Sequence, residues 1–239
     1  MNTNEDELWF KNQIDCWNKC EQDGVFEFSY DDLYPQLNDH KKYNGNSVDM
    51  AYFVSSIFVA KQIISCNPLR HHDIGSPINE MLSKLLVGGI DVVSIDIRRT
   101  PMKIDGIEFV EGDATNLLEY IPPKSVDSLS VFYSLEHFGL GRYGDTICPK
   151  AWIDGLKGFV DVLKPGGLLY IVTSVGKKNL LRFNAHRVFR PKTIIDQIDK
   201  EMELQFFGIV ENWSLKQCDI ELDQKEIGGV FVFKKLSDF

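Results

Sequence analysis

The chain has 239 residues, of which 44% are hydrophobic and 26% are charged. This length allows one main domain with a smaller appendage, and the composition excludes a disordered, collagen-like or low-complexity protein. The formal net charge of −9 creates a field that repels nucleic acids and anionic membranes, so we expect a small or neutral partner.

Two helices are expected ahead of the main domain. Residues 5–20 carry apolar side chains at helical spacing, which is typical of an amphipathic helix. A second, more apolar helix is predicted from Asn46, as its N-cap with Asp49 in the first turn, to about Ser65. Residues 1–65 are therefore expected to form a helical extension that acts as a lid or as a homodimer contact.

From residue 66 onward, short apolar runs alternate with helical patterns. The apolar runs are RHHDIG, DVVSIDI, IEFVEGD, VDSLSVFY, LLYIVTSV, ELQFFGIVEN and GGVFVFKK. This alternation indicates a parallel sheet with crossover helices, whereas the last two runs have no helix between them and should pair antiparallel. The prediction for residues 66–239 is a Rossmann-like α/β domain with a seven-stranded, mostly parallel sheet and an antiparallel last strand. Gly228 and Gly229 are expected to mark a bend or bulge in that strand.

Three acidic residues follow three successive predicted strands. Asp73 precedes Gly75 and Ser76 at the first strand end, Asp96 ends the second strand, and Asp113 follows the third. The carboxyl ends of parallel strands form the ligand-binding edge of such a sheet, where a carboxylate can accept hydrogen bonds from ribose hydroxyls. The alternative for the first of these segments is a plain strand-to-helix turn.

The type of nucleotide follows from what surrounds these acids. The GxGxxG fingerprint of dinucleotide sites is absent after Gly75. Arg98 and Arg99 are compatible with a 2′-phosphate, but Asp96 beside them would repel it. S-adenosylmethionine carries no phosphate and needs only one close backbone approach, an acid for the ribose and a polar rim.

Taken together, the motifs DIGS, SIDI, EGDA, SLEH and LKPGG, with the closing strand pair, resemble the class I S-adenosylmethionine-dependent methyltransferase superfamily from Cys66 to Phe239. The stretches SLEHFGLGRYGD and FNAHRVF are more closely similar to a methyltransferase-like family of bacterial surface-polysaccharide gene clusters. The resemblance implies a sugar or sugar nucleotide as acceptor. It implies cofactor contacts for Asp73, Gly75, Ser76, Asp96, Ile97, Asp113, Ala114 and Ser134.

Two loops after the fourth and fifth predicted strands should face the same crevice. An acceptor hydroxyl must lose its proton, and histidine is a natural base near neutral pH. The catalytic candidates are His137, which we prefer because it follows the strand end directly, His186, Asp145 and Arg142, and the substrate-binding candidates are Glu136, Tyr143, Asn184 and Arg187. The alternative is that the glycines let the chain turn while these polar groups cap neighbouring elements.

Several other possibilities stay open at this point. Carboxylates in the crevice could hold a divalent metal ion, although orientation of ribose or arginine is the commoner role and we assign no metal ligands. The absence of the superfamily's second glycine after Gly75 favours a non-catalytic scaffold that has kept the fold. An NAD-dependent sugar-modifying enzyme is a weaker rival. The five scattered cysteines and the acidic start, which lacks a signal-peptide pattern, favour a reducing, cytoplasmic location.

Overall fold

The computed structural model describes residues 4–19, 30, 49–183 and 185–237. The chain divides into two compact units, residues 1–48 and residues 49–239. In the first unit, helix α1 (Asn4–Lys19) forms where an amphipathic helix was predicted. The second unit begins ahead of residue 66, where the sequence pattern placed the start of the main domain.

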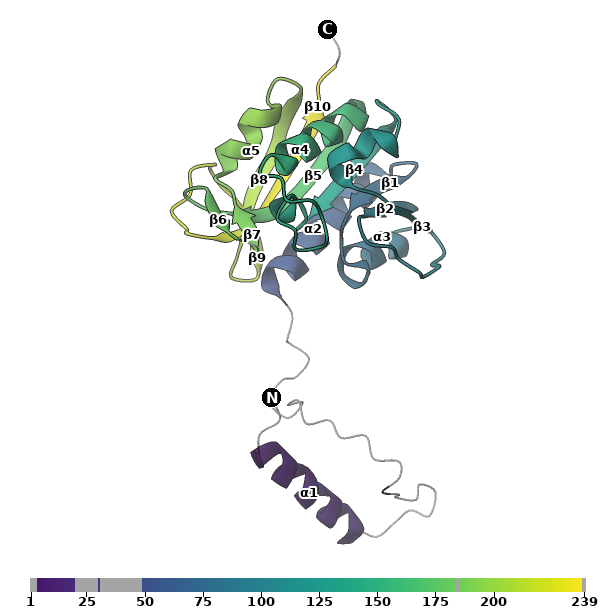
Figure 1. Cartoon of the computed structure of the whole chain (residues 1–239), viewed down its shortest axis with the longest axis vertical. Coiled ribbons are helices and arrows are strands. Elements are labelled where there is room, and N and C mark those ends of the chain that lie inside the picture. Colours follow the sequence, from purple (N-terminus) through teal and green to yellow (C-terminus); the bar gives the residue numbers. More distant parts are fainter. Residues whose placement is uncertain (1–3, 20–29, 31–48, 184, 238–239) are drawn as a thin grey trace. The chain divides into compact units, whose positions relative to one another are not determined.

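Eight strands of the second unit form one sheet in the order β3-β2-β1-β4-β5-β10-β8-β9 (Figure 1). The strands are β1 (His71–Ile74), β2 (Val92–Asp96), β3 (Ile107–Glu111), β4 (Val126–Phe132), β5 (Leu163–Val175), β8 (Met202–Glu211), β9 (Ser214–Gln217) and β10 (Ile227–Lys235). Strands β1 to β5 pair parallel. Strand β10 pairs antiparallel with both β5 and β8, which confirms the predicted fold class and the antiparallel last strand.

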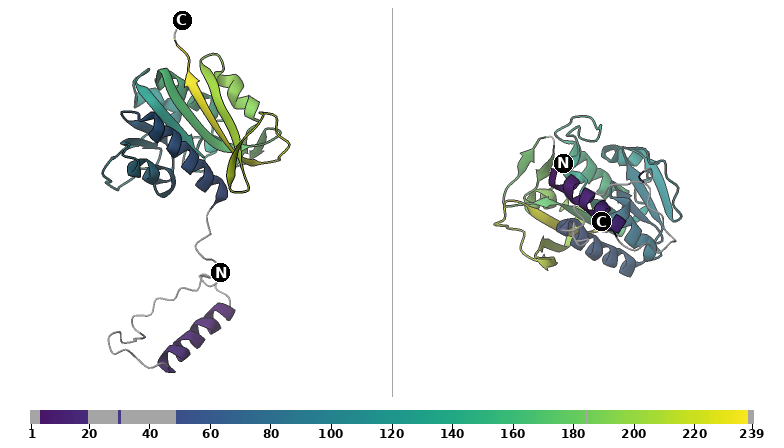
Figure 2. Two further views of the ribbon diagram at one scale, coloured as in Figure 1. Left: turned by 180° about the vertical axis from the view of Figure 1, so that it is seen from behind. Right: turned by 90° about the horizontal axis from the view of Figure 1, so that it is seen from below.

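Helices cover both faces of this sheet (Figures 1 and 2). One face carries α2 (Met50–Cys66) and α3 (Ser83–Val87), the latter preceded by a π-helical turn (Ile78–Leu82). The other face carries α4 (Ala151–Val162) and α5 (Pro191–Ile198). A parallel sheet covered on both faces favours strands that are apolar on both sides, as in the stretch LLYIV of β5. The central strands β1 and β4 instead contain buried polar residues, namely His71, Asp73, Ser128 and Ser130.

Two apolar clusters fill the spaces between the layers. In the first, Leu156 and Phe159 of α4 and Ile194 of α5 pack with the strands. In the second, Val59 and Ile63 of α2 pack on the opposite face. Helix α2 is therefore an integral layer of the sheet domain and not a detached extension.

The sheet differs from the sequence prediction in two local details. The sheet has an eighth strand, because the short β9 pairs antiparallel with the edge of β8. The irregularity of β10 falls between Val232 and Phe233 and not at the glycine pair. Gly228 instead leaves space for the Tyr133 side chain, since a Cβ at position 228 would lie 2.5 Å from the Tyr133 hydroxyl.

The start of α2 also differs from the prediction. Its N-cap is Asp49, whose carboxylate accepts hydrogen bonds from the backbone N–H groups of Ala51 and Tyr52. Asn46, the predicted N-cap, lies outside the described residues. A carboxylate at this position satisfies two of the N–H groups that every helix start leaves unpaired.

Strand order places a crevice at the centre of the sheet. The chain runs outward from β1 to β2 and β3, then returns to the other side of β1 for β4. The connections after β1 and β4 therefore leave in opposite directions, and this divergence is where ligands bind in open α/β sheets.

Candidate functional site

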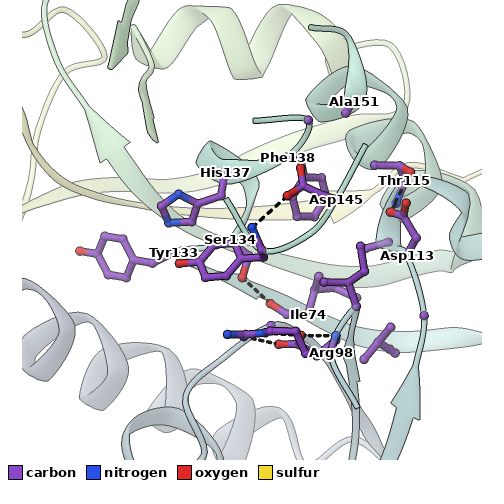
Figure 3. A pocket seen from close by; sticks show the side chains of 18 of the residues that line it. Ile74, Arg98, Asp113, Thr115, Tyr133, Ser134, His137, Phe138, Asp145 and Ala151 are labelled. Atoms are coloured by element: carbon purple, nitrogen blue, oxygen red, sulfur yellow. Dashed lines mark hydrogen bonds and ion pairs between the residues drawn. The ribbon is translucent and has the colours of Figure 1, made fainter. Parts of the chain in front are cut away.

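A cavity of about 460 Å³ lies at the carboxyl ends of β1, β2, β3 and β4 (Figure 3). Its volume is in the range of ligand sites for small molecules and cofactors. Ten residues predicted from the sequence line it: Gly75, Ser76, Asp96, Ile97, Asp113, Ala114, Ser134, His137, Tyr143 and Asp145. The sheet thus brings together side chains that are up to 70 positions apart in the sequence.

Asp73 lies beneath the cavity and does not line it. Its carboxylate is fully buried and accepts hydrogen bonds from the backbone N–H and hydroxyl of Ser76, at 3.1 and 2.6 Å, and from the hydroxyl of Ser130. Burial raises the pKa of Asp73 to about 6, against the opposing effect of these donors. Asp73 therefore stabilises the loop after β1 through its hydrogen bonds with Ser76.

The same polar network extends into the core through His71. The imidazole is fully buried between the hydroxyls of Ser128 and Ser130, at 2.8 and 2.9 Å. Burial lowers the pKa of His71 to about 3, so the ring is neutral. One of the two histidines of β1 packs in the core, as the alternating faces of a strand predict.

Gly75 is the point of closest backbone approach at the cavity. Its φ of +69° is in the left-handed region, and a Cβ there would lie 2.6 Å from the hydroxyl oxygen of Ser134. That hydroxyl donates to the carbonyl of Ile74 at 2.8 Å and ties the ends of β1 and β4 together. A side chain at position 75 would fill the space and strain the backbone.

Asp96 ends β2 at the cavity and is bound to Arg98. The Arg98 guanidinium donates from Nε and Nη2 to the two carboxylate oxygens, at 2.8 and 2.7 Å, and its backbone N–H donates at 2.8 Å (Figure 3). Partial burial opposes ionisation, but the hydrogen bonds and charge of Arg98 outweigh it and lower the pKa of Asp96. The carboxylate is thus ionised and, in this structure, occupied by Arg98.

Asp113 caps the 3₁₀ turn Ala114–Glu119 that follows β3. One of its oxygens accepts hydrogen bonds from both the backbone N–H and the hydroxyl of Thr115, at 2.9 and 2.8 Å. Thr115 also lines the cavity. Asp113 can cap this turn and also line the cavity, because the cap uses only one of its two carboxylate oxygens.

The loop between β4 and α4 forms one side of the cavity. Asp145 organises this loop, since its carboxylate accepts hydrogen bonds from the backbone N–H groups of Gly141 and Tyr143, each at 3.2 Å. The ring of Tyr143 lies 4.7 Å from the guanidinium carbon of Arg98 and 5.3 Å from that of Arg142. Tyr143 therefore connects this loop to the loop after β2.

His137 has the geometry of a proton acceptor. It lies in the 3₁₀ turn Leu135–His137, and its Nδ1 is 2.7 Å from the carbonyl oxygen of Ala185. Because a carbonyl only accepts hydrogen bonds, Nδ1 carries the proton and Nε2 keeps its lone pair. Burial lowers the pKa of His137 to about 4, so the ring is neutral near pH 7.

Glu136 is buried and is not among the residues that line the cavity. It is 2% exposed, and the hydroxyl of Thr173 donates to its Oε2 at 2.9 Å. Burial raises the pKa of Glu136 to about 7, against the effect of its hydrogen-bond donors. The predicted substrate contact of Glu136 therefore has no support from the residues that line the cavity.

Three further candidates are bound to other parts of the protein. Nε2 of His186 donates to Oε1 of Glu226 at 2.6 Å. Arg187 donates to the backbone carbonyl of Phe138 at 2.6 Å, and Arg142 donates to the carbonyl of Ala185 at 3.0 Å. None of the three lines the cavity, and Asn184 lies outside the described residues.

The cavity also contains aromatic residues that the sequence did not single out. Tyr52 of α2 and Tyr133 stack with ring centroids 4.2 Å apart, and Phe138 lines the wall beside His137. Tyr133 has a φ of +49°, which is strained for a bulky residue and frequent at functional sites. Phe138 directly follows the SLEH motif, which is a signal that could have identified it. Nothing in the sequence pattern of α2 distinguishes Tyr52 from its neighbours.

No group of three or more His, Cys, Asp or Glu residues in the described part of the chain has the arrangement of a metal site. No helix among the described residues has both the length and the apolar character that crossing a membrane requires.

Comparison with solved structures identifies the class of fold as that of class I S-adenosylmethionine-dependent methyltransferases. A 1,6-didemethyltoxoflavin-N1-methyltransferase of Burkholderia thailandensis, solved with S-adenosylhomocysteine, aligns with a TM-score of 0.55 and 16% identity over 77% of this chain and 79% of its own. The N-methyltransferase NodS of Bradyrhizobium japonicum, also solved with S-adenosylhomocysteine, gives 0.51 and 12% over 84% and 94%. The 4+2 cyclase SpnF gives 0.57 and 12% over 77% and 81%.

At these identities the similarity establishes the fold alone, and SpnF illustrates that this fold is not confined to proteins named as methyltransferases. Residues 89–227 match the profile of the family described as "Caenorhabditis protein of unknown function, DUF268", and the chain belongs to that family. A search of curated proteins gives no significant match.

Proposed function

We propose that this protein is an S-adenosylmethionine-dependent methyltransferase acting on a small molecule. The observation that carries the proposal is the convergence of Gly75, Asp96 and Asp113 with His137 around one cavity at the carboxyl edge of the sheet. The known fold neighbours that were solved with S-adenosylhomocysteine support the same choice of cofactor.

The residues present fit this cofactor. Gly75 leaves open a space that any Cβ would fill, and Ile97 and Ala114 offer apolar surface beside two carboxylates. Asp96 would hold the ribose hydroxyls once Arg98 gives up at least one of its two bonds. Asp113 would lie at the adenine. When bound, the cofactor supplies an electrophilic methyl group on a sulfonium.

The protein's own contribution to the reaction would be orientation and proton removal. Nε2 of His137 holds the lone pair that accepts the proton of an acceptor hydroxyl. The hydrogen bond from Nδ1 to the Ala185 carbonyl fixes the ring and stabilises the positive charge that develops on it. Tyr52, Tyr133 and Phe138 exclude water from this end of the cavity.

For the acceptor, we propose O-methylation of a sugar or sugar nucleotide, on the basis of the resemblance of the SLEHFGLGRYGD and FNAHRVF segments. The two-pronged grip on a substrate phosphate that Arg142 or Arg187 would provide requires these side chains to leave the backbone carbonyls that they bind here. The nucleotide part of the proposal thus depends on a rearrangement of these loops.

Titration calorimetry with S-adenosylhomocysteine is the first test. Binding supports the proposal, and absence of binding at about 1 mM ligand would favour the non-catalytic scaffold. Transfer of labelled methyl groups from S-adenosylmethionine to a panel of sugars, sugar nucleotides and amines then identifies the acceptor. A co-purified nicotinamide, detected by absorbance, would instead favour the NAD-dependent alternative.

Replacement of His137 tests the assignment of the base. We expect His137→Ala to lower kcat by about 10²- to 10⁴-fold, because general base catalysis acts in the transition state. Binding of S-adenosylhomocysteine, measured by calorimetry, should be nearly unchanged. Turnover close to that of the wild type would eliminate His137 and shift the assignment to Asp145 or to an acceptor that needs no base.

A further inference from the structure

The short hairpin that follows β5 carries the carbonyl group that binds His137. It consists of β6 (Leu180–Arg182) and β7 (His186–Val188), paired antiparallel with Arg182 opposite His186. Ala185 lies in its turn, and its carbonyl oxygen accepts hydrogen bonds from Nδ1 of His137 at 2.7 Å and from Nη1 of Arg142 at 3.0 Å. The position of this turn therefore decides which ring nitrogen of His137 carries the proton.

One carboxylate holds both strands of the hairpin. Oε2 of Glu226 accepts a hydrogen bond from Nη2 of Arg182, and Oε1 lies 2.6 Å from Nε2 of His186. The Glu226 side chain is 29% exposed. Partial burial opposes its ionisation, but the hydrogen bonds from His186 and Arg182 outweigh this and lower the pKa of Glu226. Glu226 directly precedes β10, which pairs with β5 along its length, so the clamp connects the hairpin to the rigid sheet.

On its other side the hairpin is bound to the turn that carries His137. Nη1 of Arg187 donates to the backbone carbonyls of Phe138, at 2.6 Å, and of Glu136, at 3.4 Å. Arg187 thus contacts the residues immediately before and after His137. The hairpin is therefore bound on one side to the sheet and on the other to the turn that carries His137. Its Ala185 carbonyl is the group that contacts the imidazole.

We propose that Glu226 is a positioning residue for His137. By clamping Arg182 and His186, it holds the Ala185 carbonyl against Nδ1 and so maintains the tautomer whose Nε2 is unprotonated at the cavity. A free imidazole side chain populates both tautomers, and which one is present in a protein is set by the hydrogen bond of the other nitrogen. The effect on turnover rests on the proposed function, whereas the effect on the tautomer does not.

The test is the tautomer itself, read from long-range proton–nitrogen correlation spectra of the full chain labelled with ¹⁵N-histidine. The His137 signals are assigned with His137→Gln. In the wild type we expect Nδ1 to carry the proton. In Glu226→Ala we expect the population with the proton on Nδ1 to fall about tenfold as the proton moves to Nε2, and kcat to fall with it by about tenfold, with unchanged affinity for S-adenosylhomocysteine.

Glu221→Ala is the matched control. Glu221 lies on the same connection between β9 and β10, and its side chain is 61% exposed. Among the described residues its carboxylate pairs with Arg190, at 2.7 Å, and not with a residue of the hairpin. Its spectrum should equal that of the wild type. A change of the same size in Glu221→Ala would mean that any loss of charge in this connection disturbs the site, and would overturn the proposal.

Arg182→Ala is a second test in case Glu226→Ala fails to fold. It removes only one of the two contacts of Glu226, at a side chain that is 41% exposed. It should shift the tautomer in the same direction. An unchanged His137 spectrum in a folded Glu226→Ala or Arg182→Ala protein would overturn the proposal. Absence of cofactor binding by the wild type would refute the proposed function, and the spectra would still decide the positioning role.

Discussion

Asp96 and Arg98 bind each other at the position that we propose for the cofactor ribose. The guanidinium engages both carboxylate oxygens, and its side chain is 57% exposed while that of Asp96 is 20% exposed. An ion pair this exposed contributes about 0.2–1 kcal/mol. Arg98 is therefore a weak competitor that a ribose can displace.

Removal of Arg98 should accordingly improve cofactor binding. We expect Arg98→Met to tighten the binding of S-adenosylhomocysteine about two- to fivefold, whereas Asp96→Ala should weaken it about 30- to 150-fold through the loss of two charge-assisted hydrogen bonds. Titration calorimetry measures both. Arg99→Met is the control, because it removes the same charge from the same loop outside the cavity lining. Weaker binding by Arg98→Met would mean that Arg98 itself contacts the ligand.

Glu136 should make stability depend on pH. Its pKa of about 7 in the native state, compared with the ordinary value of 4.5, means that the native state holds this proton more tightly than the unfolded state. The resulting stabilisation is complete below about pH 4.5 and is lost as the pH rises through about 7, a difference of about 3 kcal/mol.

Urea unfolding of Glu136→Gln at several pH values tests this. Gln cannot ionise but still accepts a hydrogen bond from Thr173, so the variant should gain stability relative to the wild type as the pH rises from about 4.5 to 8, by about 3 kcal/mol. The same substitution at the exposed Glu119 should give no such trend. A constant difference between Glu136→Gln and the wild type across this range would refute the prediction.

At this scale the sequence identifies residues by their place at strand ends. Asp96 and Asp113 could be predicted to meet because the carboxyl ends of parallel strands share an edge. The binding partners of a charged side chain could not be predicted. Arg187 and Glu136 were both expected in loops after strands, yet Arg187 lies in β7 and binds backbone carbonyls, and Glu136 is buried against Thr173. Tyr52 reaches the cavity through the packing of a helix distant in sequence.

Among the elements, the turn after β1 depends most on a single residue. Gly75 and Gly89 have similar φ values of +69° and +75°, but a Cβ on Gly75 meets the Ser134 hydroxyl, whereas a Cβ on Gly89 has nothing within 4 Å. Comparing alanine substitutions at Gly75 and Gly89 therefore separates the effect of backbone strain from the effect of a steric clash with Ser134.

We expect Gly89→Ala to cost about 1–2 kcal/mol of unfolding free energy from its left-handed backbone. Gly75→Ala should cost about 1 kcal/mol more, because Ser134 must rotate and lose its hydrogen bond to Ile74. Only Gly75→Ala should also weaken binding of S-adenosylhomocysteine, by about tenfold or more. Equal stability and equal binding in both variants, measured by urea unfolding and calorimetry, would contradict this assignment.

The long, buried strands could be predicted from their apolar runs, and the final antiparallel pair from the lack of a helix between its members. The hairpin β6–β7 and strand β9 could not, because three or four partly exposed residues give no periodic signal and pair only through contacts made elsewhere. Elements whose stability comes from tertiary packing are the ones that local patterns miss.

For the molecule as a whole, α2 should contribute strongly to stability. Ile63 is fully buried against the sheet, whereas Leu69, just beyond the helix, is 93% exposed. We expect Ile63→Ala to lower the unfolding free energy by about 2–5 kcal/mol and Leu69→Ala to change it by less than about 0.5 kcal/mol. Urea unfolding compares them, and a small effect of Ile63→Ala would mean that the domain begins after α2.

The place of β10 in the sheet has a consequence for the order of folding. Strands β8 and β9 form a hairpin, and among the described strands their ladder to the rest of the sheet runs through β10 alone. The parallel half, β1 to β5, can pair without residues 227–235, but β8 cannot join it before β10 has aligned along β5. Joining of β8 to the sheet therefore needs one pairing step more than joining of β4, so during refolding the backbone amides of β4 should gain full protection from hydrogen exchange before those of β8.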